Sequence, residues 1–261
     1  MKLSCQEGMV PGKSLEEKVA NLERYGFDGI EIFGSDLVER KKEVIAATKG
    51  RKVRPSSICT GYRGCLLSPD RQERDLALRD IKELLGICAE IGAEGLIVVP
   101  IFGEARLPDL APYKTVFDLE QDLLIDLLGD LSRYAEKVGS VILLEPLNRY
   151  ETHFMNRIED AVRIAKRINS PAVKVMADFF HMNIEEKTIP EAMIYAGTLL
   201  AHVHLADSTR FLPGWGHTDF RAALDALKRM GYQKYMAFEC GVPGDPEVLL
   251  PRTVRYLREL M

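Results

Sequence analysis

The chain has 261 residues, of which 46% are hydrophobic and 28% are charged. This composition is typical of globular domains and excludes disordered, disulfide-rich secreted and coiled-coil proteins. The 35 basic and 39 acidic residues give a net charge of -4, which argues against a nucleic-acid groove or a membrane-seeking face. No apolar run approaches the roughly 20 residues that a membrane-spanning helix needs. We therefore expect neither a nucleic-acid nor a membrane partner.

The cysteines are odd in number and scattered, and none of their spacings forms a zinc knuckle or a CxxC redox pair. They stand at positions 5, 59, 65, 88 and 240. Gln6 and Glu7 interrupt the N-terminal segment, so it lacks the apolar region of a signal peptide. We expect reduced thiols and a cytoplasmic location.

Short β-rich runs alternate with longer amphipathic stretches along the chain. The eight predicted strands are Lys2–Cys5, Gly29–Phe33, Val53–Cys59, Gly95–Pro100, Val141–Pro146, Val173–Asp178, Ala201–Leu205 and Tyr235–Glu239. Helices are predicted from Leu15 to Tyr25, and at Leu76–Ile91, Asp118–Val138, Arg157–Ile168, Pro190–Leu200, Phe220–Met230 and Pro246–Leu260. Gly26, Gly92 and Gly139 are expected to end the first three.

The pattern repeats about every 33 residues without a linker, which predicts one domain over residues 1–261. Several strands are continuous apolar runs, as in parallel sheets that are buried on both faces. Eight such units favour a (β/α)8 TIM barrel. The segment after the first strand matches neither GxGxxG nor a Walker A loop, so we expect no nucleotide cofactor.

Four predicted strand ends carry a side chain that can bind a metal. Along the chain the spacings between them are 33, 26 and 35 residues, or about one βα unit each. They are Glu145, Asp178, His204 and Glu239. One buried carboxylate of this kind is more often part of an ion pair, but four at one height on neighbouring strands favour a metal site.

Three carboxylates and one imidazole suit Mn²⁺ or Co²⁺, with Mg²⁺ as an alternative, better than a sulfur-rich structural zinc site. His202 and His204 lie two residues apart and point to the same face of their strand. His204 is nearer the strand end and is the predicted ligand, which leaves His202 as a core or supporting residue.

Three segments resemble the xylose-isomerase-like barrel superfamily. They are Glu145-Pro-Leu-Asn-Arg-Tyr-Glu-Thr-His, Asp178-Phe-Phe-His-Met-Asn-Ile-Glu-Glu and His202-Val-His-Leu-Ala-Asp-Ser-Thr-Arg. Within the superfamily they are most similar to the D-tagatose, D-psicose and L-ribulose 3-epimerases. The resemblance is strongest from residue 141 to residue 240.

The resemblance implies that the four strand-end residues bind one divalent ion and that Glu145 and Glu239 are also the acid and base. It further implies that Glu151, His181 and Arg210 form hydrogen bonds with the sugar. The implied reaction is inversion of C3 of a free ketose through an enediolate, without a redox cofactor. We also expect a homo-oligomer, either a dimer or a tetramer.

Three other activities are compatible with parts of this pattern. Aldose–ketose isomerisation, as in hydroxypyruvate isomerase, uses the same enediolate chemistry and is the first alternative. Dehydration of a keto-inositol comes next. A phosphodiesterase similar to endonuclease IV would need further histidines on the second and third strands, where residues 31–34 and 57–61 contain none.

The remaining residues near the predicted strand ends allow two interpretations each. Trp215 either stacks on a sugar or wedges its loop, and Glu31 either lines the pocket or pairs with a cation. His217 and Asp219 could bind a second metal, although Asp219 is better placed to cap the helix at Phe220. Substrate selectivity is expected at Cys5, Glu7, Cys59, Phe102, Tyr113 and Cys240.

Overall fold

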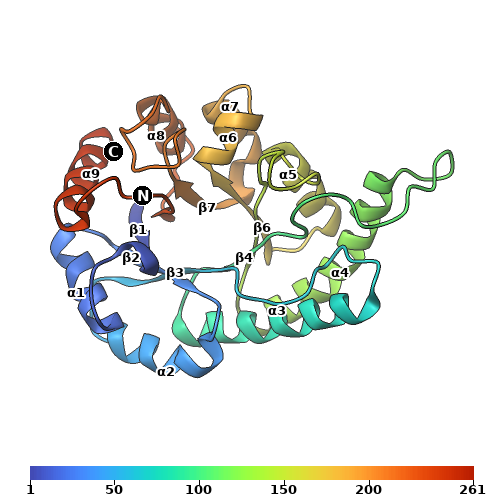
Figure 1. The fold of residues 1–261 in the computed structure, drawn as a ribbon, viewed down its shortest axis with the longest axis horizontal. Coiled ribbons are helices and arrows are strands. Elements are labelled where there is room, and N and C mark those ends of the chain that lie inside the picture. Colours follow the sequence, from blue (N-terminus) through green and yellow to red (C-terminus); the bar gives the residue numbers. More distant parts are fainter.

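The computed structural model describes residues 1–261 as a closed barrel of eight parallel strands, ordered β1 to β8 as in the sequence (Figure 1). β8 pairs with β1 and so closes the ring. The strands are β1 Lys2–Gln6, β2 Gly29–Phe33, β3 Arg54–Cys59, β4 Leu96–Val98, β5 Ile142–Leu144, β6 Val173–Asp178, β7 Leu200–Leu205 and β8 Tyr235–Phe238. The prediction of a (β/α)8 TIM barrel is confirmed.

Helices surround the strands (Figure 1). They are α1 Leu15–Tyr25, α2 Leu37–Thr48, α3 Arg71–Ile91, α4 Val116–Val138, α5 Ile158–Ile168, α6 Phe179–Glu185, α7 Ile189–Ala196, α8 Phe220–Arg229 and α9 Pro246–Leu260. As predicted, α1, α3 and α4 end at Gly26, Gly92 and Gly139, each in the left-handed conformation that glycine adopts without strain. None of the helices combines the length and the apolar character needed to cross a bilayer.

Two helices were not predicted. All five residues at positions 39–43 of α2 are charged, and this run obscures the apolar face formed by Leu37, Val44 and Ala47. α6 has only seven residues, too few for a periodic pattern to be recognised. The predicted helix Pro190–Leu200 is α7 followed by a short 3-10 turn at Gly197–Leu199, and β7 already begins at Leu200.

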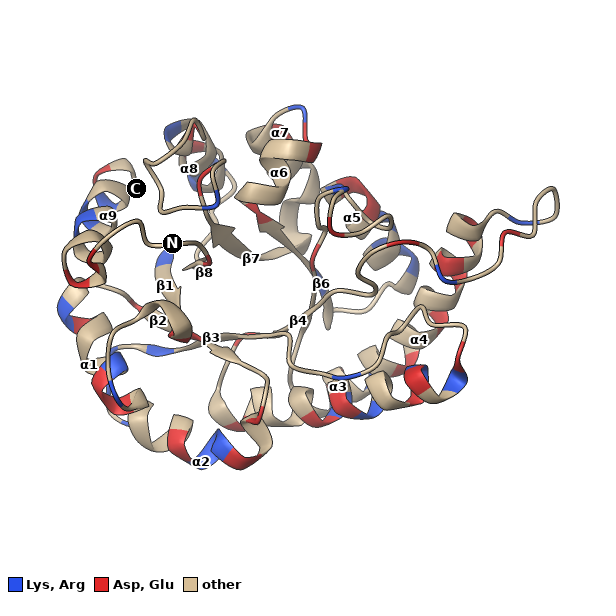
Figure 2. Ribbon diagram, viewed as in Figure 1, with Lys and Arg blue, Asp and Glu red and all other residues tan.

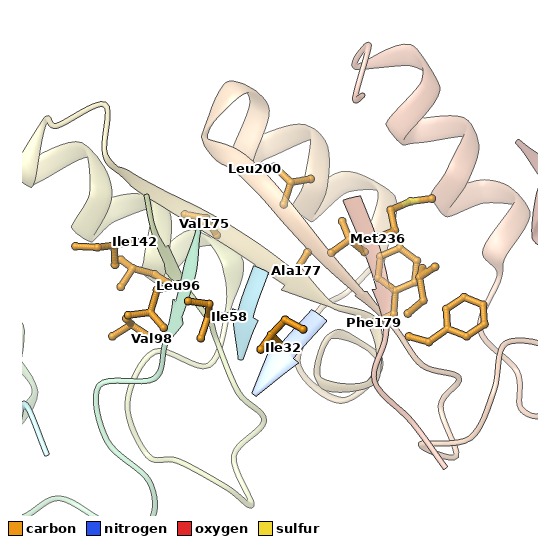
Figure 3. Packing of buried hydrophobic residues seen from close by; sticks show 14 of the residues in the cluster. Ile32, Ile58, Leu96, Val98, Ile142, Val175, Ala177, Phe179, Leu200 and Met236 are labelled. Atoms are coloured by element: carbon orange, nitrogen blue, oxygen red, sulfur yellow. The ribbon is translucent and has the colours of Figure 1, made fainter. Parts of the chain in front are cut away.

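Alternating strand residues divide the apolar side chains into two clusters. The large outer cluster lies between strands and helices, and Figure 3 shows part of it, including Ile32, Val98 and Met236. A small inner cluster fills the barrel and consists of Cys59, Ile97, Leu143, Met176 and Ala201. Because side chains alternate along a strand, Leu143 inside the barrel places Glu145 on the same inner side, and Met176 does the same for Asp178.

Two register shifts adjust which inner residues meet. Between β2 and β3 the pairing passes from Ile30–Pro55 to Glu31–Ser57, and between β6 and β7 it passes from Val175–Leu200 to Met176–His202. Each shift inserts one extra residue into one strand, and the second places His204 opposite Asp178.

The loops at the C-terminal ends of the strands form the mouth of the barrel. The segment between β4 and α4 projects away from the body of the molecule (Figure 1). In Figure 2 the positions of Lys and Arg are interspersed with those of Asp and Glu along the outer helices. The chemistry of the protein must therefore be sought inside the mouth, where β5 to β8 end.

Candidate metal centre and active site

Four side chains converge at the mouth of the barrel. Each of Glu145, Asp178, His204 and Glu239 offers one ligand atom, and these atoms all lie within 4.8 Å of one another. The first three side chains are buried, and Glu239 is partly exposed. The structure thus brings together the four residues that the spacing had selected.

The backbone explains why they meet. Asp178 is the last residue of β6, and its carboxylate also accepts the amide of Phe180 at the start of α6. His204 lies directly opposite Asp178 in β7. Glu145 and Glu239 each follow the last residue of their strand, β5 and β8, so both carboxylates stand at the strand ends.

The environment of His204 fits a cation. Its Nδ1 lies 3.0 Å from Glu239, 3.5 Å from Glu145 and 3.5 Å from Asp178. This nitrogen is buried and has no hydrogen-bond partner of acceptable geometry. A nitrogen lone pair that faces three carboxylates is stable only with a proton or a metal between them, and this donor set of oxygen and imidazole nitrogen suits a divalent ion.

Glu145, Asp178 and His204 have shifted pKa values. Burial raises the pKa of Glu145, and the neighbouring carboxylates add to this effect. Burial also opposes ionisation of Asp178, but the charge of Arg210 and the contact with His204 outweigh it and hold the pKa of Asp178 well below its usual value. Burial disfavours the charged form of His204, yet Glu31 and Glu239 raise its pKa well above the ordinary value. Such shifts are typical of functional sites.

Arg210 extends over the same carboxylates. Its Nη1 donates to Asp178 over 2.6 Å, and its Nη2 donates to Glu239. The backbone of Arg210 is left-handed, with φ of 59°, and its amide donates to the carbonyl of Asp207 over 2.8 Å. A non-glycine residue in this conformation is uncommon, and here it is held by a tight turn that aims the guanidinium at the site.

His181 and Glu151 lie beside the cluster and share a partner that was not predicted. Asn148 donates from its backbone amide to Nδ1 of His181 over 3.2 Å, and its side chain donates to Glu151 over 2.9 Å. Nε2 of His181 lies 3.8 Å from Asp178. Asn148 occurs in the recognised segment after Glu145, but nothing in its spacing shows that it contacts both residues.

A second buried network lies below the four converging side chains. Oε2 of Glu31 accepts hydrogen bonds from Ser57, His202 and His204. Gln6 donates to Glu31 over 3.3 Å and to Glu239 over 2.9 Å, and so connects the two groups. Glu31 was expected either to line the pocket or to pair with a cation. Its contacts with His202 and His204 support the pairing. Ser57 and Gln6 were not predicted, because their contacts depend on strand register.

Other expectations have mixed outcomes. Asp219 caps α8 by accepting the amide of Ala222, as predicted. Cys59 lies near the site, 3.7 Å from Glu239, whereas Cys5 packs in the outer apolar cluster and cannot line the pocket. The pleat of β1 decides this, because Gln6 points into the barrel and Cys5 therefore points outward.

The rim residues are more exposed. Glu7 is an exception, because it is buried and pairs with Arg40 of α2. Tyr113 is 85% exposed on the projecting segment between β4 and α4, and Trp215 is 47% exposed in the loop after β7. The side chains of Tyr113 and Trp215 form no hydrogen bond with the four converging side chains.

A family model described as "Xylose isomerase-like TIM barrel" matches residues 19–260. The chain belongs to the xylose isomerase-like TIM barrel family. The resemblance inferred from the three motifs is thereby confirmed. Among the relatives of this chain, a 3-dehydro-D-guloside 4-epimerase from Escherichia coli is 35% identical to it over 241 residues, which cover 92% of each protein.

Two further comparisons extend this result. A D-psicose 3-epimerase from Enterocloster bolteae is 41% identical over 106 residues, which cover 41% of this barrel and 35% of that protein. The crystal structure of 3-keto-D-glucoside 4-epimerase from E. coli, in its apo form, has a TM-score of 0.90 at 33% identity and covers 99% of both chains. These three proteins are named as sugar epimerases that act at C3 or at C4.

Proposed function

We propose that this protein is a metal-dependent sugar epimerase that inverts the hydroxyl-bearing carbon next to a ketone. The observation that carries the proposal is the convergence of Glu145 and Glu239 on His204 and Asp178 at the mouth of the barrel. Two carboxylates beside one candidate metal position supply what the reaction needs, namely two proton carriers and a centre of positive charge. The similarity to sugar epimerases over most of the chain supports the same class of reaction.

The proposed substrate is a hexoside with a ketone at C3, which would be inverted at C4. This choice rests on the relative that matches over 92% of the chain and is named as a 4-epimerase. Inversion at C3 of a free ketose, as expected from the motifs, is the second candidate and is supported by the shorter match to a 3-epimerase. In both substrates the carbon that is inverted lies next to the carbonyl group, which acidifies its proton.

Glu145, Asp178, His204 and Glu239 would hold the divalent ion, with Mn²⁺, Co²⁺ and Mg²⁺ as candidates. When bound, the ion supplies a Lewis acid that polarises the ketone and offsets the charge of the enediolate. Glu145 and Glu239, both beside the ion, would remove and return the proton of the carbon that is inverted.

The residues around the cluster would orient the sugar. His181 and Arg210 are donors directed at the site and would hold the oxygen on which negative charge develops. Glu151 lies at the edge and has a half-exposed carboxylate that is suited to accept a sugar hydroxyl. Arg210 pairs with Asp178 and Glu239, so a sugar would meet a guanidinium that is already oriented.

A deuterium experiment tests the proposal. The enzyme is loaded with Mn²⁺, Co²⁺ or Mg²⁺ and incubated in D2O with methyl 3-keto-glucoside and, separately, with a panel of free ketoses, and products are followed by NMR after removal of paramagnetic ions. We expect an epimer that carries deuterium at the inverted carbon, and no turnover after chelation. Conversion of a ketose to an aldose, with label only at C1 or C2, would contradict epimerisation and favour the isomerase alternative.

Three further expectations belong to the same proposal. Residues 1–261 would act as one domain, since β1 and β8 from the two ends of the chain pair with each other. A cytoplasmic location is supported by the five cysteines, all of which are free thiols in the structure. A homo-oligomeric state, as a dimer or tetramer, is to be tested by light scattering.

A further inference from the structure

We propose that Glu31 is a positioning residue of the metal centre: it holds the ring of His204 so that Nε2 carries the proton and Nδ1 is presented to the ion. The inference rests on the proposed metal centre, because it concerns how this centre is assembled. Glu31 is on β2 and His204 is on β7, so the contact crosses the inside of the barrel.

One carboxylate oxygen of Glu31 has three hydrogen-bond donors. Its Oε2 accepts the hydroxyl of Ser57 over 2.7 Å and lies 3.0 Å from Nε2 of both His202 and His204. The side chains of Glu31 and His204 are fully buried. A buried carboxylate needs donors, so both imidazoles must direct a protonated Nε2 at it.

The proton on Nε2 determines what the opposite nitrogen can do. A neutral imidazole with Nε2–H has a free lone pair on Nδ1, and Nδ1 of His204 is the atom that faces Glu145, Asp178 and Glu239. Metal-binding histidines commonly donate their second nitrogen to a carboxylate, which fixes the tautomer and the direction of the ring. Glu31 occupies that place here.

The same cluster is a poor second metal site. Glu31, His202 and His204 have ligand atoms close enough to be considered for an ion. However, three donors already converge on one oxygen of Glu31, and a metal there would have to displace the protons of two of them. His204 would also have to bind a different ion through each nitrogen. The arrangement therefore favours one ion, at the mouth, with Glu31 supporting it.

The position of Glu31 is itself fixed by the fold. The register shift between β2 and β3 places Ser57 opposite Glu31 rather than one residue away. Gln6 then holds the other oxygen of Glu31, and the same amide reaches Glu239. Glu31 is thus held from three strands, which gives His204 a rigid partner rather than a mobile one.

The first test compares Mn²⁺ binding to wild type, Glu31→Gln and Ser57→Ala by isothermal titration calorimetry. A glutamine has the same size, but it removes the anion and introduces an amide donor that competes for the Nε2 position. We expect Glu31→Gln to weaken Mn²⁺ binding by about 10–100-fold. Ser57→Ala removes one of the three donors to Oε2 of Glu31 and leaves the bond to His204, so it should weaken Mn²⁺ binding less than Glu31→Gln does. Circular dichroism checks that both variants are folded.

The second test uses the wild-type protein and does not depend on a variant that folds. Two-bond ¹H–¹⁵N NMR spectra of histidine-labelled enzyme, loaded with diamagnetic Mg²⁺ or Zn²⁺, report the tautomer of each of the 5 histidines. We expect His204 to carry its proton on Nε2 and to shift at Nδ1 on metal loading. If Glu31 only stabilised the fold, its replacement by glutamine would change neither the tautomer of His204 nor the affinity for the metal.

The outcomes separate the inference from the proposed function. Wild-type Mn²⁺ affinity in folded Glu31→Gln, or an Nδ1–H tautomer in the loaded enzyme, would overturn the role of Glu31 and leave the epimerase proposal intact. Failure of the wild-type protein to bind any divalent ion would overturn both. Binding of two ions per chain, with the second lost in His202→Asn, would show that the Glu31 cluster is a metal site instead.

Discussion

Asn148 and His181 are joined by a hydrogen bond from the backbone amide of Asn148 to Nδ1 of the imidazole, 3.2 Å long. An amide N–H can only donate, so Nδ1 of His181 must accept, and the neutral ring carries its proton on Nε2. Nε2 lies on the side of Asp178, 3.8 Å from its carboxylate. His181 therefore enters the candidate site as a donor, which is the role that an oxygen with developing negative charge requires.

Replacing Asn148 tests this arrangement. Asn148→Ala keeps the backbone amide but removes the side-chain contacts with His181 and Glu151. We expect kcat/KM to fall on the order of 10–100-fold, because both groups lose their orientation, while Mn²⁺ affinity is unchanged. Asn156→Ala is the matched control, since Asn156 holds the same loop through the carbonyl of Leu147 without contacting His181. Equal losses in both variants would assign the effect to the loop as a whole.

Replacing Arg210 should affect metal binding and turnover in different directions. Its guanidinium pairs with Asp178 and Glu239, so Arg210→Ala leaves the candidate metal site more negative. We expect Mn²⁺ to bind at least as tightly as in wild type, whereas turnover falls by about 10²–10³-fold through loss of a donor to the developing charge. Calorimetry and initial rates on the same preparations check both parts. A collapse of metal affinity would show that Arg210 organises the ion rather than the sugar.

The architecture of the site could be predicted because it follows the period of the fold. Strand ends recur about once per βα unit, so Glu145, Asp178, His204 and Glu239 could be assigned to one rim from spacing alone. The same reasoning cannot locate contacts across the barrel. Glu31 meets His204, 173 residues later, only because the barrel closes.

Strand register accounts for most of what the sequence did not reveal. Ser57 faces Glu31 because one extra residue enters β3 directly after Pro55. A proline inside a strand is typical of a bulge, but it does not show which neighbouring residue is the extra one. The end of β1 was predicted one residue early, which left Gln6 in a loop and placed Cys5 at the pocket. The structure extends β1 to Gln6, so the alternation of side chains assigns the inner position to Gln6.

Asp207 supports the loop that carries Arg210, and its effect should depend on pH. Its buried carboxylate accepts the backbone amides of Ser208, Gly214 and Thr218. Burial disfavours the charged form, but these amides outweigh it and lower the pKa of Asp207 below its usual value. A group whose pKa is lower in the folded state stabilises that state above the unfolded pKa, near 4, and loses this contribution as the pH falls.

We therefore expect Asp207→Asn to lower the free energy of unfolding by about 1.5–3 kcal/mol at pH 7, the range for hydrogen bonds to a charged group. The difference from wild type should shrink as the pH falls below about 4. Urea unfolding at several pH values measures it. Ser208→Ala, which removes only the hydroxyl beside Asp207, is the control and should show little pH dependence. A difference that stays constant down to pH 3 would assign the loss to packing.

Glu145 and Glu239 can be separated by following exchange and inversion at the same carbon. In a two-base mechanism each glutamate serves one face of that carbon, so each metal-loaded variant, Glu145→Gln or Glu239→Gln, should lose inversion by about 10²–10⁴-fold. The glutamate that remains can still remove a proton and return deuterium on its own side. One variant should therefore exchange label into one epimer without inverting it, and the other variant should do so with the opposite epimer. Both substitutions also change the charge around His204, so metal occupancy is measured in each preparation and rates are compared at full loading. If either loaded variant inverts its substrate at close to the wild-type rate, a single base serves both faces, and the pair of glutamates would then be needed for metal binding alone.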